Sequence, residues 1–234
     1  PYRVWVADLA DPFTVEIKAG QVVELAPRVK PGEAKLEVRC QGWDGTALEG
    51  ESASVIWGSP RRGAQADFKE GVARFEGLGL GAVTVKIKTE VPVGEARSVK
   101  IGDQTLTSRS SQTWTYRSPA TLTKSEGSLV VRLPDPATGG TVSGTIVPPS
   151  EGRPGAPRSL KVFAISEDLV IEESCSGGGE FSLALPPGRY SIVGVAYGLS
   201  WTSSYSPDPK KGVVVEVTGG AAIKAGEVPA LKAR

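Results

Sequence analysis

The sequence predicts an all-β protein that consists of two tandem β-sandwiches preceded by an extra N-terminal β segment. Short runs of residues alternate between apolar and polar side chains, which is typical of half-buried strands. The 29 Gly and 18 Pro residues punctuate these runs and disfavour helices. No convincing amphipathic helix pattern occurs in the 234 residues, and regular short strands separated by turn signals indicate sandwiches.

Residues 1–32 are predicted to be a separate β segment. The pattern at residues 15–20 resembles those at residues 99–103 and 215–219, which lie near the end of each later module. The segment is therefore interpreted as the closing strands of a module whose beginning is absent. Such strands have apolar faces and unpaired backbone groups that need a partner, in the same chain or in another subunit. The candidate assembly residues are Tyr2, Val4, Trp5, Val6, Phe13, Val15 and Ile17.

Residues 33–137 are predicted to form the first sandwich. The run at residues 36–40 has the alternation of a strand, and a turn signal and a second run at residues 54–57 follow it. Residues 71–78 then lead through Gly81 to a further strand at residues 83–85. We expect this strand–turn–strand segment to be a hairpin.

Residues 138–234 repeat this order and are predicted to form the second sandwich. Residues 141–146 match the first run, and residues 160–163 match the second. Residues 179–183 then lead through a Pro-Pro-Gly turn to a strand at residues 190–192. Pro sets φ at the first central residue of such a turn and Gly accepts a positive φ at the second, so a second hairpin is expected here.

Three motifs of the second sandwich carry a family resemblance. They are Val142-Ser143-Gly144, Gly179-Glu180-Phe181 and the Leu-Pro-Pro-Gly-Arg-Tyr run at residues 185–190. The chain resembles carboxypeptidase regulatory-like domains in these motifs, more clearly in the second module than in the first. The resemblance implies an Ig-like, transthyretin-like sandwich of seven strands. It implies little about function, because the enzyme activity in that family belongs to a separate domain.

The composition excludes several kinds of catalytic site. The chain has no His, so Ser-His-Asp and Cys-His nucleophile systems and His-ligated zinc sites are excluded. Glu172 and Glu173 are adjacent, and on a strand they point to opposite faces rather than forming a catalytic carboxylate pair. The Asp residues are scattered, which disfavours calcium binding. We therefore expect a protein with no enzyme activity, no catalytic residue, no metal site and no cofactor.

Five aromatic side chains are candidates for stacking on a ligand such as a sugar. Trp114 and Tyr116 share one strand face, whereas Trp201 and Tyr205 lie in a Ser-rich stretch near Tyr197. The alternative interpretation is packing in a core or an interface, where Trp and Tyr are common.

The two cysteines lie in different predicted modules. Cys40 shares the alternating face of Leu36 and Val38, which indicates a buried free thiol. A disulfide between Cys40 and Cys175 is the alternative, since an oxidising compartment permits one and the sequence gives no distance between them.

Charge and hydropathy limit the partners and the location. The net charge of +1 lacks the basic footprint of nucleic-acid binding. No run of about 18 apolar residues occurs, so we expect no membrane span. The chain begins with Pro1 and contains no Met, from which we expect that an upstream region was removed or that the chain is an excerpt. We favour a secreted protein, in the extracellular space or at the cell surface.

Two functional hypotheses follow. The first is a non-catalytic structural protein, a subunit of an extracellular filament or a cell-surface layer, whose copies form a homopolymer by pairing strands through residues 1–32. The alternative is an accessory module of a larger secreted or surface protein. It would contact neighbouring modules and bind a polysaccharide or a protein partner through Trp201 and Tyr205.

Overall fold

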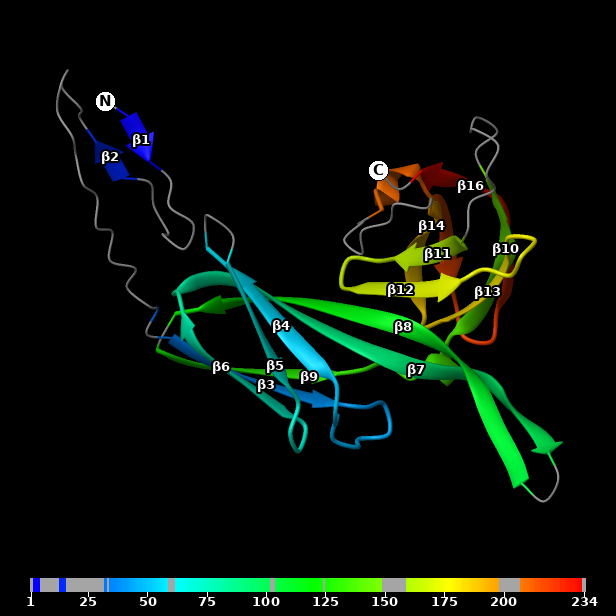
Figure 1. Cartoon of the computed structure of the whole chain (residues 1–234), viewed down its shortest axis with the longest axis horizontal. Helices are drawn as coiled ribbons and strands as arrows, with labels where there is room; N and C mark the ends of the chain where they lie inside the picture. Colours follow the sequence, from blue (N-terminus) through cyan, green and yellow to red (C-terminus); the bar gives the residue numbers. More distant parts are fainter. Residues whose placement is uncertain are drawn as a thin grey trace. The chain divides into compact units, whose positions relative to one another are not determined.

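The computed structural model describes residues 2–4, 13–15, 32, 34–58, 62–101, 104–123, 125–148, 159–197 and 207–232. Within these residues the regular structure is β-strand, apart from the two short 3-10 helices η1 (Pro136–Thr138) and η2 (Pro209–Lys211). The all-β prediction is therefore confirmed (Figure 1).

The strands form an N-terminal pair and two sets of seven. The N-terminal pair is β1 (Tyr2–Val4) and β2 (Phe13–Val15). The first set is β3 (Ala34–Gln41), β4 (Ser52–Trp57), β5 (Arg62–Asp67), β6 (Val72–Leu78), β7 (Gly81–Ile101), β8 (Gln104–Leu122) and β9 (Glu126–Arg132). The second set is β10 (Gly140–Val147), β11 (Ser159–Ile165), β12 (Leu169–Ser174), β13 (Glu180–Leu185), β14 (Gly188–Tyr197), β15 (Val213–Val217) and β16 (Ala222–Lys232).

Both sets have the same connectivity. One sheet has the order β6-β3-β9 in the first set and β13-β10-β16 in the second, and in each the central strand pairs with one antiparallel and one parallel neighbour. The other set of pairings has the order β8-β7-β4-β5 in the first set and β15-β14-β11-β12 in the second, where β14 also pairs with the end of β16. The chain thus contains two tandem sandwiches. The repeated runs at residues 36–40 and 141–146, at 54–57 and 160–163, and at 71–78 and 179–183 lie in corresponding strands.

Alternation fills the core of each sandwich. In β3 the residues Leu36, Val38 and Cys40 are buried, and their neighbours along the strand are more exposed. The opposite sheet contributes Val55 and Val85, which are also buried. Burial of one such aliphatic side chain stabilises a fold by about 1.5–3 kcal/mol, so this pattern is the main source of stability.

The two expected hairpins are wrong in one respect. β6 pairs with β3, whereas β7 lies in another sheet. β13 pairs with β10, and β10 and β16 separate it from β14 in the strand order. Neither turn therefore joins two paired strands. The physical reason is that the apolar faces of both strands are buried across the core, and alternation specifies the buried face but not the sheet.

The chain divides into two compact units that differ from a simple division into modules. Unit 1 contains residues 1–87 and 117–133, and unit 2 contains residues 88–116 and 134–234. The last strand of the first set, β9, ends at Arg132, and the first strand of the second set, β10, begins at Gly140. Residues 88–116, which are the end of β7 and the beginning of β8, nevertheless belong to unit 2. Strands of 21 and 19 residues make this possible.

The N-terminal strands pair with one another in the antiparallel register Tyr2↔Val15 and Val4↔Phe13. They form a sheet of two strands. The other predicted assembly residues, Trp5, Val6 and Ile17, lie outside the described residues. The pattern shared with residues 99–103 does not mark a common position, because β7 contains Val99–Ile101 and corresponds to β14 rather than to β15.

Candidate functional site

The clearest candidate site is a strand junction in unit 2, where β8 pairs with β12. The pairing is antiparallel, with Leu169 opposite Tyr116 and Ile171 opposite Trp114. β8 belongs by connectivity to the first set of strands and β12 to the second. The edge of the β15-β14-β11-β12 sheet is therefore extended by a strand from the other set, which is strand addition within one chain. We call this contact the β8–β12 junction.

The local sequence suits this pairing. Residues 113–116 read Thr-Trp-Thr-Tyr, in which β-branched and aromatic residues alternate and favour an extended strand. Trp114 is 0% exposed and lies opposite the fully buried Ile171. The buried face of β8 therefore continues the buried face of the second sandwich.

A buried polar pair lies beside Trp114. The Gln112 Nε2 donates a hydrogen bond of 2.6 Å to Glu173 Oε2, and the Gln112 side chain is 0% exposed. Burial raises the pKa of the Glu173 carboxyl, and the hydrogen bond from Gln112 opposes this shift. Within the described residues Gln112 Oε1 and Trp114 Nε1 are buried without a hydrogen-bond partner. Each such group costs about 1–3 kcal/mol.

The neighbouring carboxylate Glu172 points to the opposite face of β12. It forms an ion pair with Lys161 of β11, and the Lys161 ammonium lies 5.8 Å from the centre of the Tyr197 ring. The prediction that Glu172 and Glu173 face opposite sides is confirmed. Glu172 is thus held in an ion pair with Lys161, and Glu173 is held in a hydrogen bond with Gln112. The two carboxylates do not form a pair with each other.

Three of the aromatic candidates for ligand stacking lie in the described part of the chain, and two of these three are buried. Tyr197 is 4% exposed and belongs to a cluster of buried residues with Phe163, Val170, Val193 and Val195. Trp114 is fully buried, and Tyr116 is half-buried. Stacking on a ligand requires an open ring face, which Trp114 and Tyr197 lack. Trp201 and Tyr205 lie outside the described residues.

Cys40 is a buried free cysteine of unit 1, and Cys175 is a half-buried free cysteine of unit 2. The disulfide between them that the sequence left open stays a prediction. Burial raises the pKa of Cys40 to about 11. Burial, with a smaller effect of the Glu173 charge, raises the pKa of Cys175 to about 11 as well. Both thiols are therefore protonated at neutral pH and are poor nucleophiles.

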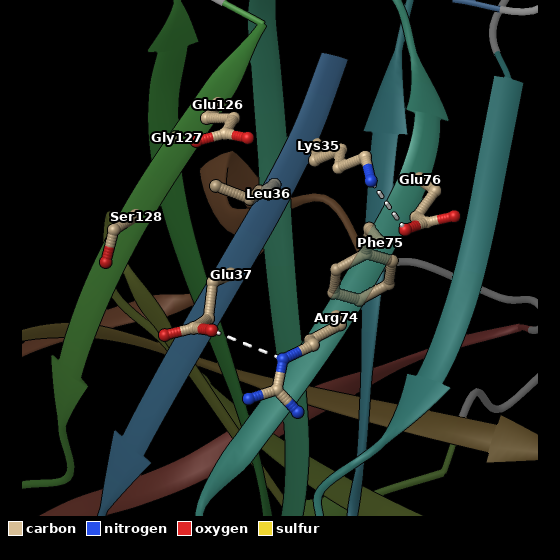
Figure 2. A pocket seen from close by; sticks show the side chains of 9 residues that line it. All are labelled: Lys35, Leu36, Glu37, Arg74, Phe75, Glu76, Glu126, Gly127 and Ser128. Atoms are coloured by element: carbon tan, nitrogen blue, oxygen red, sulfur yellow. Dashed lines mark hydrogen bonds and ion pairs between the residues drawn. The ribbon is translucent and has the colours of Figure 1, made fainter. Parts of the chain in front are cut away.

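Unit 1 has a pocket of about 470 Å³ on the β6-β3-β9 sheet. Figure 2 shows two charged pairs in it, with Lys35 3.1 Å from Glu76 and Arg74 3.3 Å from Glu37. A hydrogen bond from Arg39 is the largest cause that lowers the pKa of Glu37. Glu126 and Ser128 also line the pocket.

No group of three or more His, Cys, Asp or Glu side chains in the described ranges is placed to hold a metal ion. Among these residues there is also no helix with the length and apolarity needed to cross a membrane.

No protein-family model and no curated protein matches the chain. Solved structures show weak similarity. The minor pilin of Streptococcus agalactiae is 11% identical over 86% of this chain and 98% of that one, with a TM-score of 0.33. A streptococcal ancillary pilin is 14% identical over 96% of this chain and 73% of that one, with a TM-score of 0.27.

The Bacillus anthracis TIE protein is 17% identical over 82% of this chain, with a TM-score of 0.27. This chain spans only 33% of that protein. Similarities of this strength transfer no function to the chain.

Proposed function

We propose that this chain is a non-catalytic structural protein of the cell surface or extracellular space, whose copies assemble by pairing β-strands. The observation that carries the proposal is the β8–β12 junction, where a sheet edge accepts a strand from another module. Strand addition between subunits uses the same main-chain hydrogen bonds. A head-to-tail contact of this kind, repeated from copy to copy, builds an open filament.

The N-terminal segment, residues 1–32, is the proposed donor. β1 and β2 form a sheet of only two strands, so each has one further edge that no described strand covers. A two-stranded sheet is marginally stable in water and gains from joining a larger sheet. The donor would dock on an exposed sheet edge of the next copy.

Membership of the carboxypeptidase regulatory-like family belongs to the same proposal. It is supported by the seven-strand connectivity that occurs twice, with the turn after β13 carrying Pro186, Pro187 and Gly188. The fold alone does not assign a function, and the assembly role rests on the strand junction.

Deletion of residues 1–32 tests the donor. Light scattering and electron microscopy would measure assembly of the full and shortened chains, and circular dichroism would confirm that the shortened chain retains its β structure. Loss of assembly with retained folding supports the proposal. Assembly that persists unchanged contradicts the donor assignment, and a full chain that stays monomeric at high concentration contradicts assembly itself.

A further inference from the structure

The β8–β12 junction joins two particular kinds of edge. β8 is the strand next to β7 at one end of the first set's sheet, and β12 is the last strand at the other end of the second set's sheet. The other end of the first set's sheet is β5, which pairs with β4, and the other end of the second set's sheet is β15, which pairs with β14. Within the described residues, β15 and β5 have no second strand partner. The chain therefore joins one end strand of each sheet within itself, at the β8–β12 junction. The other two end strands, β5 and β15, are left to pair in the same way with another copy.

Both remaining edges have the properties of strands that accept a partner. β15 reads Val-Val-Val-Glu-Val and β5 reads Arg-Gly-Ala-Gln-Ala-Asp, so neither contains a Pro that would remove a backbone donor. Val214 on β15 is 56% exposed. β15 carries a charge at Glu216, and β5 carries charges at its two ends, Arg62 and Asp67. The runs 213–215 and 63–66 are uncharged, and an uncharged run at a sheet edge favours pairing with another strand.

We infer that β15 of one copy pairs antiparallel with β5 of a second copy of this chain. The contact deepens the proposed function, since it rests on self-assembly by strand pairing, but it uses residues other than 1–32. The β8–β12 junction places buried residues of both strands opposite each other, as Trp114 and Ile171 show. The proposed register follows the same rule and centres the two strands on each other. It sets Val215, which is buried, opposite Ala64, which pairs with the buried Val55 inside its own sheet.

This register has a specific consequence for the outer face. With Val215 opposite Ala64 in an antiparallel pair, Val214 lies opposite Gln65, and Glu216 lies opposite Gly63. No two like charges then face each other, and large Val side chains meet small Ala side chains. Residues directly opposite in an antiparallel pair have Cα atoms about 4.5–5.5 Å apart, and this separation lies within the range that a disulfide spans.

The first experiment is a mixed crosslink in the full chain. Cys40→Ala and Cys175→Ser remove the natural thiols, and Val214→Cys and Gln65→Cys are made in separate chains. Mixing the two under mild oxidation is expected to give a disulfide between Cys side chains at 214 and 65, identified by peptide mass. A mixture of Val130→Cys with Gln65→Cys is the matched control, because Val130 is a 65% exposed valine on edge strand β9. Crosslinking by the control to the same extent would overturn the inference.

The second experiment reverses charge across the contact. Val214→Glu with Gln65→Glu places like charges opposite each other, whereas Val214→Lys with Gln65→Glu places opposite charges there. We expect the first pair to associate about tenfold more weakly than the second, measured by sedimentation. Thermal unfolding would show that both variants fold, which is expected since both positions are exposed.

The outcomes separate this inference from the proposed function. Assembly that survives both charge variants equally, without the 214–65 disulfide, overturns the β15–β5 contact and leaves assembly through residues 1–32. A closed dimer in which two β15 strands pair would give a 214–214 disulfide and would also overturn it. An unchanged chain that never associates contradicts both proposals.

Discussion

Glu172 and Glu173 show how neighbouring residues acquire opposite roles on a strand. Glu172 is paired with Lys161, whereas Glu173 accepts one hydrogen bond from the buried Gln112. Alternation along a strand is visible in the sequence, so their opposite orientation was predictable. The raised pKa of Glu173 was not, because it is caused by burial, and burial depends on strands that are distant in the chain, such as β8 with Gln112, 61 residues away.

The substitution Glu173→Gln is expected to stabilise the protein at pH 7. The native pKa of Glu173 is raised above its ordinary value of 4.5, so the stability linked to its protonation is present below pH 4.5 and is lost as the pH rises through the native pKa. A Gln at 173 stays neutral and can donate to the unpaired Gln112 Oε1. We expect a gain of about 1 kcal/mol in urea unfolding at pH 7, and a smaller difference at pH 4.

Glu172→Gln is the matched control, since it makes the same change one residue away. It removes the charge that pairs with Lys161 and is expected to lower stability at pH 7. Equal effects of the two substitutions would show that the Gln112 contact does not distinguish Glu173 from Glu172.

At the scale of elements, the long β7–β8 ribbon is the feature that links the sandwiches in the chain. Its outer part belongs to unit 2, and β8 completes the edge at β12. Trp114 is the side chain of this edge with the largest buried volume. The junction therefore depends on hydrophobic burial as well as on backbone hydrogen bonds.

Trp114→Ala tests that dependence. Removal of a fully buried indole is expected to cost about 3–5 kcal/mol in the free energy of unfolding, measured by urea titration. Thr115→Ala changes the next residue, on the opposite face, and is expected to cost less than about 1 kcal/mol. A loss below about 1 kcal/mol for Trp114→Ala would mean that the ring is open to solvent and would restore it as a stacking candidate.

The elements differ in how far the sequence predicted them. The runs around Leu36, Val142 and Val215 became strands because period-two alternation is a local property of the chain. The change of partner strands after β6 and β13, and the assignment of residues 88–116 to unit 2, depend on partners distant in the chain. Alternation does not encode the identity of the partner strand, so the junction was not predictable.

At the scale of the whole molecule, the unpaired edges of the sheets are the features that permit assembly. The chain uses one strand to complete an edge of its second sandwich, and β5, β15 and the N-terminal pair have edges without a second partner among the described strands. Natural proteins usually protect such edges with charge, Pro or a covering segment. Edges that lack these features are suited to contacts between copies.

Hydrogen exchange at two protein concentrations tests this account most directly. Backbone amides at an unpaired edge exchange fast, and pairing with another copy protects them. Between dilute and concentrated solutions of the unchanged chain, we predict new protection in residues 62–67, 213–217 and 1–32, and none in β9 or β13. Exchange rates in these three segments that do not change with concentration would contradict assembly by strand pairing.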